Sequence, residues 1–479
     1  MRMFVKNMNF KLMKKKICKN NELKMYRYYK RMLSLLDNIR GVGEESGIKE
    51  EPRKEKEEKV VKKMKLLSQG TYGCVFRPGI ECSNNQLTTK KYITKVQKNK
   101  KTSEHEVGLG KEIKKIVGYH QYYAPIIESC SLKIGNINND EDVKKCKIID
   151  NVLGKDDKYE ANKIPYVGKN TLLENVYNET QKVSSVESYL KRYINKHIVL
   201  LKGITKLNDA GIVHLDIKEN NIMCRNKSGR PILIDFGLSV NIKKLESKEI
   251  EAREPFYSYS VEYGSWCLDI LMISYMVNET KNANVNNEKK EAWRDEKATV
   301  EEMKKVIREY VSENVGLLEV LSSEEKEKYK KDMEEYYTPL IEGGMMNIPT
   351  WGNLYDELIK HHKSWDNYGV SIMFCNMLKI LGIEKLVKEI PFMKKYLEIL
   401  KGVIVSMPDK RPTSGETQKE IENELRKVSR VDQKKMKNLL SIEFMNIDKN
   451  NNRNKSIMEK KLQSLNESSI YRGNLMKMK

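Results

Sequence analysis

Hydrophobic and polar residues change their spacing along the chain, and the changes predict where strands and helices lie. From about residue 64, short apolar stretches such as "MKLLSQGTYGCVF" and "YITKV" alternate with Gly, Pro and polar residues, a pattern typical of strands and turns. The next segment, "SEHEVGLGKEIKKIV" (103–117), predicts a helix. Further short strands are expected up to about residue 167.

From about residue 184 the pattern becomes helical. In "VESYLKRYINKHIVLLKGITKLNDAG" (186–211) the apolar residues recur with a period near 3.6 residues. Gly211 then stands where a helix C-cap is expected. The order is therefore a strand-rich part followed by a helix-rich part.

A polar stretch at residues 278–297 interrupts the helix-rich part, and an inserted helical piece is expected up to about residue 360. Two helices are predicted there by capping boxes, Thr299 with Glu302 and Ser322 with Glu325. An apolar stripe marks the first of them: Met303, Val306, Ile307, Tyr310 and Val311. We interpret the stripe as packing, since nothing in it indicates chemistry.

The two ends of the chain differ from the middle. Residues 1–61 form a basic extension with one short predicted helix (22–39), followed by a charged linker. Residues 429–479 form a Lys/Asn-rich tail, which we predict to be mostly disordered.

Composition narrows the functional classes. The net charge is +22 over 479 residues, but the lysines are scattered and mixed with glutamate, so we interpret them as a general basic bias. Nucleic-acid binding has no support beyond this charge. The eight cysteines show no paired pattern and are expected to be reduced thiols. No apolar run is long enough for a membrane span, and the N-terminus lacks the apolar region of a secretory signal.

The stretch "GIVHLDIKENNIM" (211–223) carries the strongest chemical signal. It spaces four polar residues as His214, Asp216, Lys218 and Asn221, and "PILIDFG" (231–237) follows with Asp235, Phe236 and Gly237. The Asp235 carboxylate and the Asn221 amide oxygen flank a predicted strand–turn–strand hairpin. Such oxygen ligands suit Mg²⁺ that is also bound to phosphates. A further carboxylate can accept a hydroxyl proton, and the lysine can neutralise phosphoryl charge. Each motif alone is weak, but together they indicate phosphoryl transfer.

In these motifs the chain resembles the protein kinase superfamily. The resemblance implies an α+β, two-lobed kinase fold, with a small β-rich N-lobe and a larger helical C-lobe that carries the helical insertion. It assigns residues 62–428 to the kinase domain, divided into N-lobe 62–167 and C-lobe 168–428, with the insertion at about 270–360. Asp216 is then the catalytic base, Lys218 a phosphate contact, and Asn221 and Asp235 the metal ligands. His214, Phe236 and Gly237 become structural residues of the motifs.

The resemblance also implies a nucleotide site in the N-lobe. Gly70, Gly73 and Val75 in "LLSQGTYGCVF" match the glycine-rich loop, with Ser68 in place of its first glycine. Lys95 in "YITKV" is the expected strand lysine, preferred over Lys90 and Lys91 at the end of a loop.

Other landmarks of the family leave alternatives open. The glutamate that pairs with Lys95 is expected to be Glu106, with Glu112 as the alternative. Glu262 is expected to replace the glutamate of Ala-Pro-Glu, and Arg411 in "PDKRPT" to be its buried partner. For the aspartate of the central C-lobe helix we prefer Asp366 over Asp269, because "SWDNYGVSIMF" (364–374) better resembles the family pattern.

Lys218 is typical of serine/threonine kinases. The wider set of motifs is most similar to serine/threonine kinases of nucleocytoplasmic large DNA viruses. The implied cofactors are ATP and Mg²⁺, with Mn²⁺ as an alternative, and the implied partner is a protein with a Ser or Thr acceptor. Localisation is expected to be cytoplasmic, or in the infected-cell cytoplasm or virion if the source is viral. The sequence predicts no oligomeric state.

Two other functions remain open, a weakly active pseudokinase or scaffold and a small-molecule phosphotransferase of the same fold. Departures from the family pattern favour the first, among them Ser68 and the long loop before Lys95. Leu215 is a further departure, because the family usually has an arginine there that pairs with a phosphate on the activation loop. We therefore expect activity that does not depend on phosphorylation of that loop.

Overall fold

The computed structural model describes residues 64–70, 73–80, 82, 91–133, 141–149, 158–180, 186–247, 250–281, 283, 292–342, 350–381 and 390–427. They belong to one compact unit, which begins at Lys62. The predicted N-terminal helix, the charged linker and the Lys/Asn-rich tail lie outside the described residues.

A five-stranded antiparallel sheet forms the first part of this unit, in the order β1-β2-β3-β5-β4. Its strands are β1 (Lys65–Gln69), β2 (Cys74–Arg77), β3 (Tyr92–Gln97), β4 (Glu128–Lys133) and β5 (Lys158–Pro165). Apolar residues from several strands close a small core of their own, among them Phe76, Val96 and Leu132, all fully buried. The strand-rich part predicted from the sequence is confirmed.

Helix α3 (Lys100–Lys115) packs against β5 and is the helix predicted at 103–117. Its apolar residues Leu109 and Ile113 join the larger core of the helical part rather than the core of the sheet. Gly110 lies so close to the carbonyl of Ile126 that an added Cβ would stand 2.5 Å from its oxygen. Helix α3 is therefore fixed to both parts. The short helix α4 (Glu141–Lys144) lies against β1.

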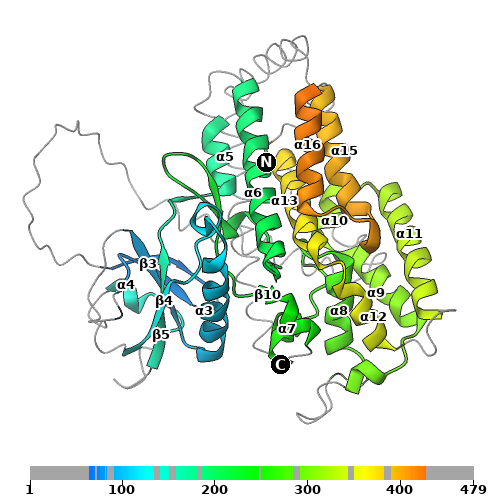
Figure 1. The fold of residues 1–479 in the computed structure, drawn as a ribbon, viewed down its shortest axis with the longest axis horizontal. Coiled ribbons are helices and arrows are strands. Elements are labelled where there is room, and N and C mark those ends of the chain that lie inside the picture. The colour runs from blue at the N-terminus through cyan, green and yellow to red at the C-terminus, as the bar shows by residue number, and fades with distance from the viewer. Residues whose placement is uncertain are drawn as a thin grey trace, which may run out of the picture. The chain divides into compact units, whose positions relative to one another are not determined.

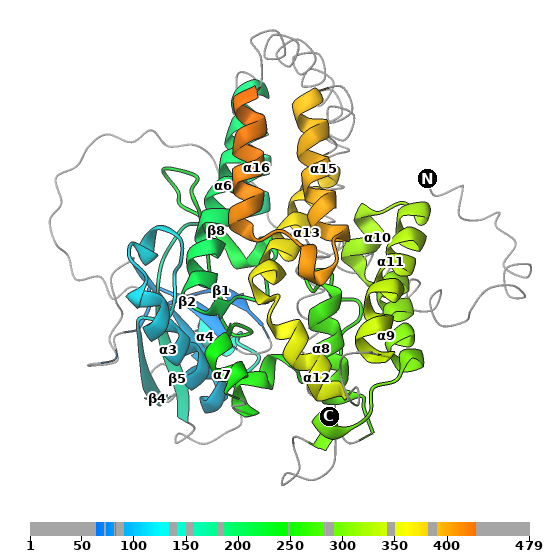
Figure 2. The same ribbon diagram turned by 45° about the vertical axis from the view of Figure 1, so that its right-hand side comes forward.

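The helical part is built around α6 and α13. Its main helices are α5 (Leu172–Thr180), α6 (Val186–Asp209), α7 (Ile242–Glu246), α8 (Leu268–Asn278), α13 (Trp365–Ile380), α15 (Pro391–Val405) and α16 (Ser414–Lys427). Figures 1 and 2 show α6, α13, α15 and α16 side by side, with the strands to one side of them. Gly211 follows α6 with a φ of 76°, the left-handed conformation expected at a helix C-terminus.

Two small sheets hold the segments that carry the motifs. One has the order β6-β8-β9 and the other pairs β10 with β7. Their strands are β6 (Asn170–Thr171), β7 (Ile212–Val213), β8 (Ile222–Cys224), β9 (Pro231–Leu233) and β10 (Val240–Asn241). Strands β8 and β9 form the hairpin that the sequence predicts between Asn221 and Asp235.

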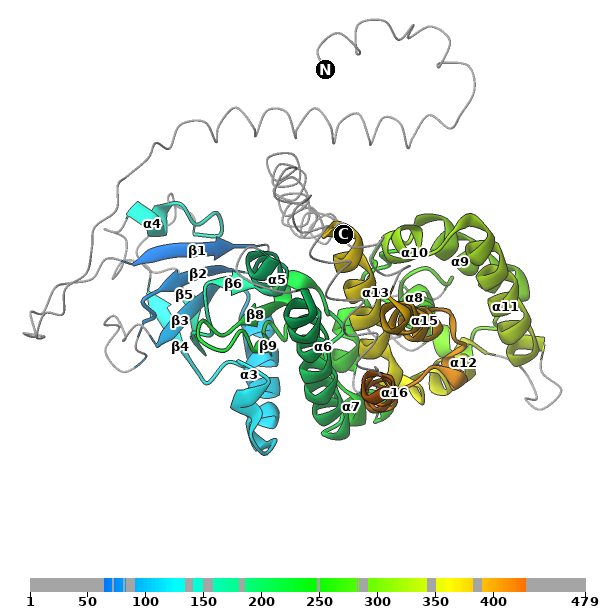
Figure 3. The same ribbon diagram turned by 90° about the horizontal axis from the view of Figure 1, so that it is seen from above.

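The insertion is helical, as predicted. It contains α9 (Val300–Glu313), α10 (Val315–Val320), α11 (Ser323–Glu342) and α12 (Trp351–Ile359). Seen from above, they lie on the side of α13 away from the sheet (Figure 3). The apolar stripe of α9 is buried. Both predicted capping boxes are present, because the Thr299 hydroxyl accepts from the N–H of Glu302 and the Ser322 hydroxyl accepts from the N–H of Glu325, each at 3.2 Å.

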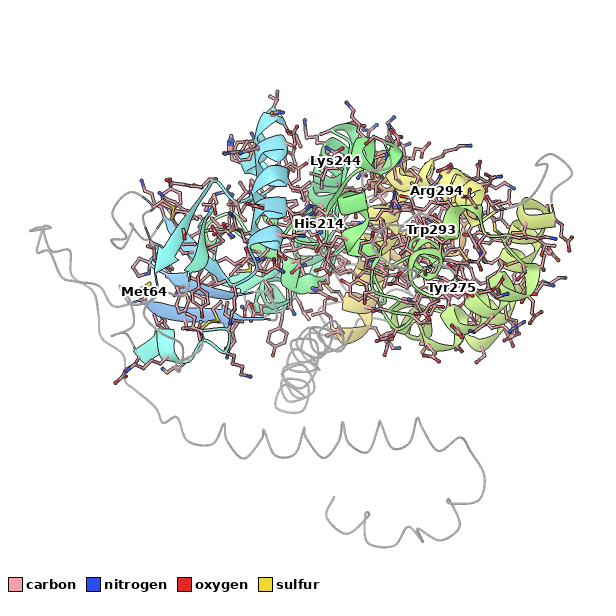
Figure 4. All side chains as sticks on the ribbon, turned by 90° about the horizontal axis from the view of Figure 1, so that it is seen from below. Met64, His214, Lys244, Tyr275, Trp293 and Arg294 are labelled. Atoms are coloured by element: carbon pink, nitrogen blue, oxygen red, sulfur yellow. A yellow bond between two sulfur atoms is a disulfide. The ribbon has the colours of Figure 1, made fainter. Side chains whose placement is uncertain are left out.

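Helix α8 lies at the boundary between the insertion and the rest of the helical part. Tyr275 on α8 packs edge-on against Trp351 on α12, with ring centroids 5.6 Å apart. In Figure 4, Tyr275 lies near Trp293 and Arg294 at the start of the insertion. The Arg294 guanidinium binds Asp356 of α12 at 2.6 Å. Among the described helices, none has both the length and the apolar character needed to cross a bilayer.

The expectation that the cysteines are reduced is wrong for four of them. Cys74 is bonded to Cys146, and Cys82 to Cys130. The pairs are separated by 72 and 48 residues, so only the folded sheet brings their sulfurs together. Cys224, Cys267 and Cys375 are free and buried.

Thiol labelling tests this pairing. In protein denatured without reductant, we expect an alkylating reagent to modify Cys224, Cys267 and Cys375 but to leave Cys74, Cys82, Cys130 and Cys146 unmodified until a reductant is added. Peptide mass spectrometry of the two samples provides the measurement. Full labelling of all four without reductant would contradict the disulfides.

Candidate active site

Lys95 reaches the centre of the site from β3. Its neighbour in β2 is Val75 and its neighbour in β5 is Asn162. The ammonium lies 2.8 Å from Glu106 on α3 and 3.0 Å from Asp235, which follows β9. One side chain thus joins the sheet, helix α3 and the helical part.

Glu106, not Glu112, is the glutamate that the structure places against Lys95. The Glu106 carboxylate is 3% exposed and binds the ammonium through both oxygens, at 2.8 and 3.0 Å. Glu112 lies six residues further along α3, is 44% exposed and pairs with Lys115 instead. The side of α3 that carries Glu106 therefore faces the sheet, and Glu112 lies on a more exposed side.

The charge of Lys95 depends on these carboxylates. Burial lowers the pKa of the Lys95 ammonium, but Asp235 and Glu106 outweigh that effect and hold its pKa above the ordinary value. Lys95 is therefore a fixed positive charge within the site, suited to binding the oxygens of a phosphate.

Gln97 orients Glu106 and is itself held by a buried polar network with Asn162 and Ser103, none of which was predicted from the sequence. The Gln97 amide donates to Glu106 at 3.0 Å, and Asn162 contacts Gln97 and binds Ser103 of α3 at 2.9 Å. Gln97 and Asn162 are fully buried and Ser103 is 1% exposed. Gln97 could have been recognised from the sequence, because it lies two residues after Lys95 and so on the same face of the strand.

The turn between β1 and β2 carries the glycine-rich segment. The N–H of Gly70 donates to the Gly73 carbonyl at 2.9 Å. A Cβ at Gly73 would stand 2.5 Å from the Val96 carbonyl, whereas one at Gly70 would meet open space. Gly73 thus allows β2 to approach β3, while Ser68 is exposed and Val75 half-buried. Of these two glycines, Gly70 is the one with open space beside its Cα.

The segment between β7 and β8 places Asp216 beside Lys218 and Asn221. The Lys218 ammonium is 2.9 Å from one Asp216 oxygen, and the Asn221 amide nitrogen donates to that same oxygen at 2.6 Å. The other oxygen, Oδ1, is buried and accepts no hydrogen bond from the described residues. A buried acceptor without a donor is costly unless a ligand supplies one.

The backbone next to Asp216 is anchored by Asp366 at the start of α13. The Asp366 carboxylate accepts from the N–H groups of His214 and Leu215 at 2.8 and 3.0 Å. Leu215 has a φ of 60° and a buried side chain in the large core. Asp269, the alternative for this role, lies elsewhere, on α8.

Asp235 also has a left-handed backbone, with a φ of 61°. Its side chain is 46% exposed although one oxygen binds Lys95, so the carboxylate faces an open surface. Phe236, next in the chain, packs against the His214 ring at 5.0 Å between centroids. His214, near the middle of the view in Figure 4, also lies 3.2 Å from the Ile234 carbonyl. A Cβ at Gly237 would come within 3.2 Å of Glu106.

The expected pair of Glu262 with Arg411 is not what the structure shows. Arg411 forms a two-pronged ion pair with Asp269, at 2.9 and 3.0 Å, and both side chains are fully buried. Glu262 is half-buried on the segment before α8. Arg411 pairs with Asp269 because a buried guanidinium requires an equally buried carboxylate, and α8 supplies one there.

Comparison with known proteins identifies this arrangement. The family model for the protein kinase domain matches residues 61–422, more than half of the chain. The chain belongs to the protein kinase family. A stretch of 47 residues is also 53% identical to the smooth-muscle myosin light chain kinase of Gallus gallus, and it covers 10% of this chain and 2% of that relative. The two-lobed α+β fold predicted from the sequence is confirmed.

Membership in the kinase family supports phosphotransfer, with ATP and Mg²⁺ as the group's general cofactors. The residues present fit such a pair. The Asn221 amide nitrogen donates to Asp216, so its amide oxygen can bind a cation. Asp235 provides a second ligand, a partly exposed carboxylate. Mg²⁺ with a nucleotide needs only one or two protein carboxylates, because it keeps water and phosphate ligands. Within the described part of the chain, no cluster of three His, Cys, Asp or Glu side chains forms a metal cage.

The Lys95–Glu106 pair yields a test with a matched control on the same helix. We expect Glu106→Gln to lower kcat/KM for phosphotransfer by about 10- to 100-fold, since a hydrogen bond to a charged group contributes roughly 1.5–3 kcal/mol. Glu112→Gln removes the same charge from the exposed side of α3 and should change kcat/KM less than about twofold. Steady-state kinetics of both variants decide it, and equal losses would contradict the assignment of Glu106.

Proposed function

We propose that the chain is a serine/threonine protein kinase that transfers the γ-phosphate of ATP to a protein hydroxyl, with Asp216 as the catalytic base. The observation that carries this proposal is the Asp216 carboxylate. One oxygen is held by Lys218 and Asn221, and the other is buried without a donor among the described residues. A substrate hydroxyl would supply the missing donor and give up its proton there.

The other polar groups would bind and orient the nucleotide. Lys95, fixed by Glu106, would bind phosphate oxygens, and the backbone near Gly70 would approach the phosphates from the sheet. Asn221 and Asp235 would hold Mg²⁺ or Mn²⁺, which supplies charge stabilisation on the transferred group when bound. Lys218, 28% exposed and 2.9 Å from Asp216, would neutralise charge near the acceptor oxygen.

Specificity for serine and threonine rests on two observations. Lys218 stands two residues after Asp216, as in the serine/threonine kinases that the motif resembles. The short match to a myosin light chain kinase is compatible with that class. Similarity to kinases of large DNA viruses remains a prediction from the motifs.

Localisation also remains a prediction. From the sequence we expect a cytoplasmic protein, or one in an infected cell or virion. The basic charge alone gives no reason to propose a nucleic-acid partner. The two disulfides bear on this point, because such bonds persist in oxidising environments. They favour a compartment more oxidising than a typical reduced cytosol.

Replacing the base tests the proposed function. With Mg²⁺–ATP and a carrier protein such as histone or casein, we expect wild type to transfer phosphate and Asp216→Asn to lose about 10²- to 10⁴-fold in kcat. Asp209→Asn, an exposed aspartate at the end of α6, is the matched control and should retain full activity.

Chelation of divalent cations should stop transfer by wild type, and added Mg²⁺ should restore it. Absence of transfer by pure wild type would favour the pseudokinase or scaffold. Transfer to a small-molecule alcohol but to no protein would favour the small-molecule phosphotransferase.

A further inference from the structure

The inserted helices contact the segment 257–266, which runs up to helix α8. The Tyr259 hydroxyl donates to Glu309 of α9 at 2.8 Å, and the Tyr310 hydroxyl of α9 donates to the Trp266 carbonyl at 2.9 Å. The N–H of Val315 in α10 donates to the Glu262 carbonyl at 3.4 Å. The insertion thus binds the backbone of this segment at several points.

Asn314 makes the most specific of these contacts. Its amide nitrogen donates to the carbonyls of Tyr263 at 2.9 Å and Val261 at 3.3 Å. Its amide oxygen accepts from the Leu317 N–H at 3.1 Å and so caps α10. The residue is 1% exposed. One buried side chain therefore joins the start of α10 to the segment 257–266.

Gly316 brings the two backbones into direct contact. An added Cβ there would stand 2.5 Å from the Gly264 carbonyl oxygen, and a Cβ at Gly264 would stand 2.7 Å from the Gly316 nitrogen. Neither partner is a flexible side chain that could move aside. Any side chain at residue 316 must displace the segment or helix α10.

The same segment supports the loop that carries Asp216. The Ser265 hydroxyl donates to the Ile217 carbonyl at 2.7 Å, and the Trp266 indole donates to the Leu215 carbonyl at 2.9 Å. Both acceptors are immediate neighbours of Asp216 in the chain. Contacts run without a break from α10 through residues 261–266 to the proposed base.

We propose that Asn314 and Gly316 are positioning residues of the kinase, through which the insertion holds the segment 257–266 and, with it, the loop whose Asp216 would meet the hydroxyl of the protein substrate. The proposal rests on the proposed function, since it concerns the protein substrate of that site. Leu215 agrees with it, because its apolar, buried side chain offers no charge with which to order this region. We call these contacts of Asn314 and Gly316 with residues 261–264 the brace. They are built into the chain and require no phosphorylation.

Two pairs of variants test the brace. Gly316→Ala introduces the clash, and Gly402→Ala adds the same methyl to α15, where nothing lies within 4 Å. Asn314→Asp keeps the cap acceptor but removes the donor to Tyr263 and Val261. Asn99→Asp changes the same residue type at the exposed N-cap of α3 and is its control.

For Gly316→Ala and Asn314→Asp we expect the KM for histone or casein to rise about fivefold or more, because the clash in the first variant and the lost donor in the second each displace the segment 257–266. The KM for ATP should stay within about twofold, because Lys95 lies in β3, Gly70 follows β1 and Asp235 follows β9, all outside the segment 257–266. A variant that merely folds less well would lower kcat and leave both KM values unchanged. An unchanged protein KM in both variants would overturn the proposal.

Hydrogen exchange supplies a readout that needs no activity. Amides of residues 257–266 should exchange faster in Gly316→Ala and Asn314→Asp than in wild type, Gly402→Ala or Asn99→Asp. Unchanged exchange there would overturn the brace even in an inactive protein. Lack of phosphotransfer by wild type would instead overturn the proposed function, so the two failures are distinguishable.

Discussion

The carboxylate of Asp366 is the constraint on which the site depends. It is 2% exposed and accepts from two consecutive backbone N–H groups, those of His214 and Leu215. These bonds hold Leu215 at a φ of 60°, a conformation that costs a non-glycine residue roughly 1–3 kcal/mol. Burial raises the pKa of Asp366, while the backbone donors favour its ionised form. The strained backbone of Leu215 persists because Asp366 on helix α13 supplies this acceptor. Asp216 is the next residue, so its position depends on the same bonds.

Around this anchor, the site is assembled from three directions. Lys95 links the sheet to Asp235 and, through Glu106, to helix α3. The segment 257–266 supports the Asp216 loop through Ser265 and Trp266, and the insertion in turn holds that segment. A change in any one element can therefore alter the position of groups that it does not touch.

Much of this could be predicted from the sequence, because the motif residues are close in sequence and their strands and helices follow regular periods. Glu106 could be preferred over Glu112 only from the motif resemblance, since helix phase relative to the sheet is a tertiary property. Glu262 was the wrong partner for Arg411, although Asp269 stands in the apolar run "WCLDILMISYM" (266–276), where a carboxylate requires a buried partner. The disulfides, Asn162 and Asn314 could not be found, because each acts on a segment remote in sequence.

The most direct test of the central claim is to map phosphorylation sites by mass spectrometry. Purified full-length protein would be incubated with Mg²⁺–ATP and a cell extract whose own kinases have been inactivated, with the Asp216→Asn variant in parallel. We predict new phosphoserine or phosphothreonine sites with the wild type that are absent with the variant. The same sites with both proteins, sites on tyrosine alone, or no new sites would contradict a serine/threonine kinase that uses Asp216 as its base.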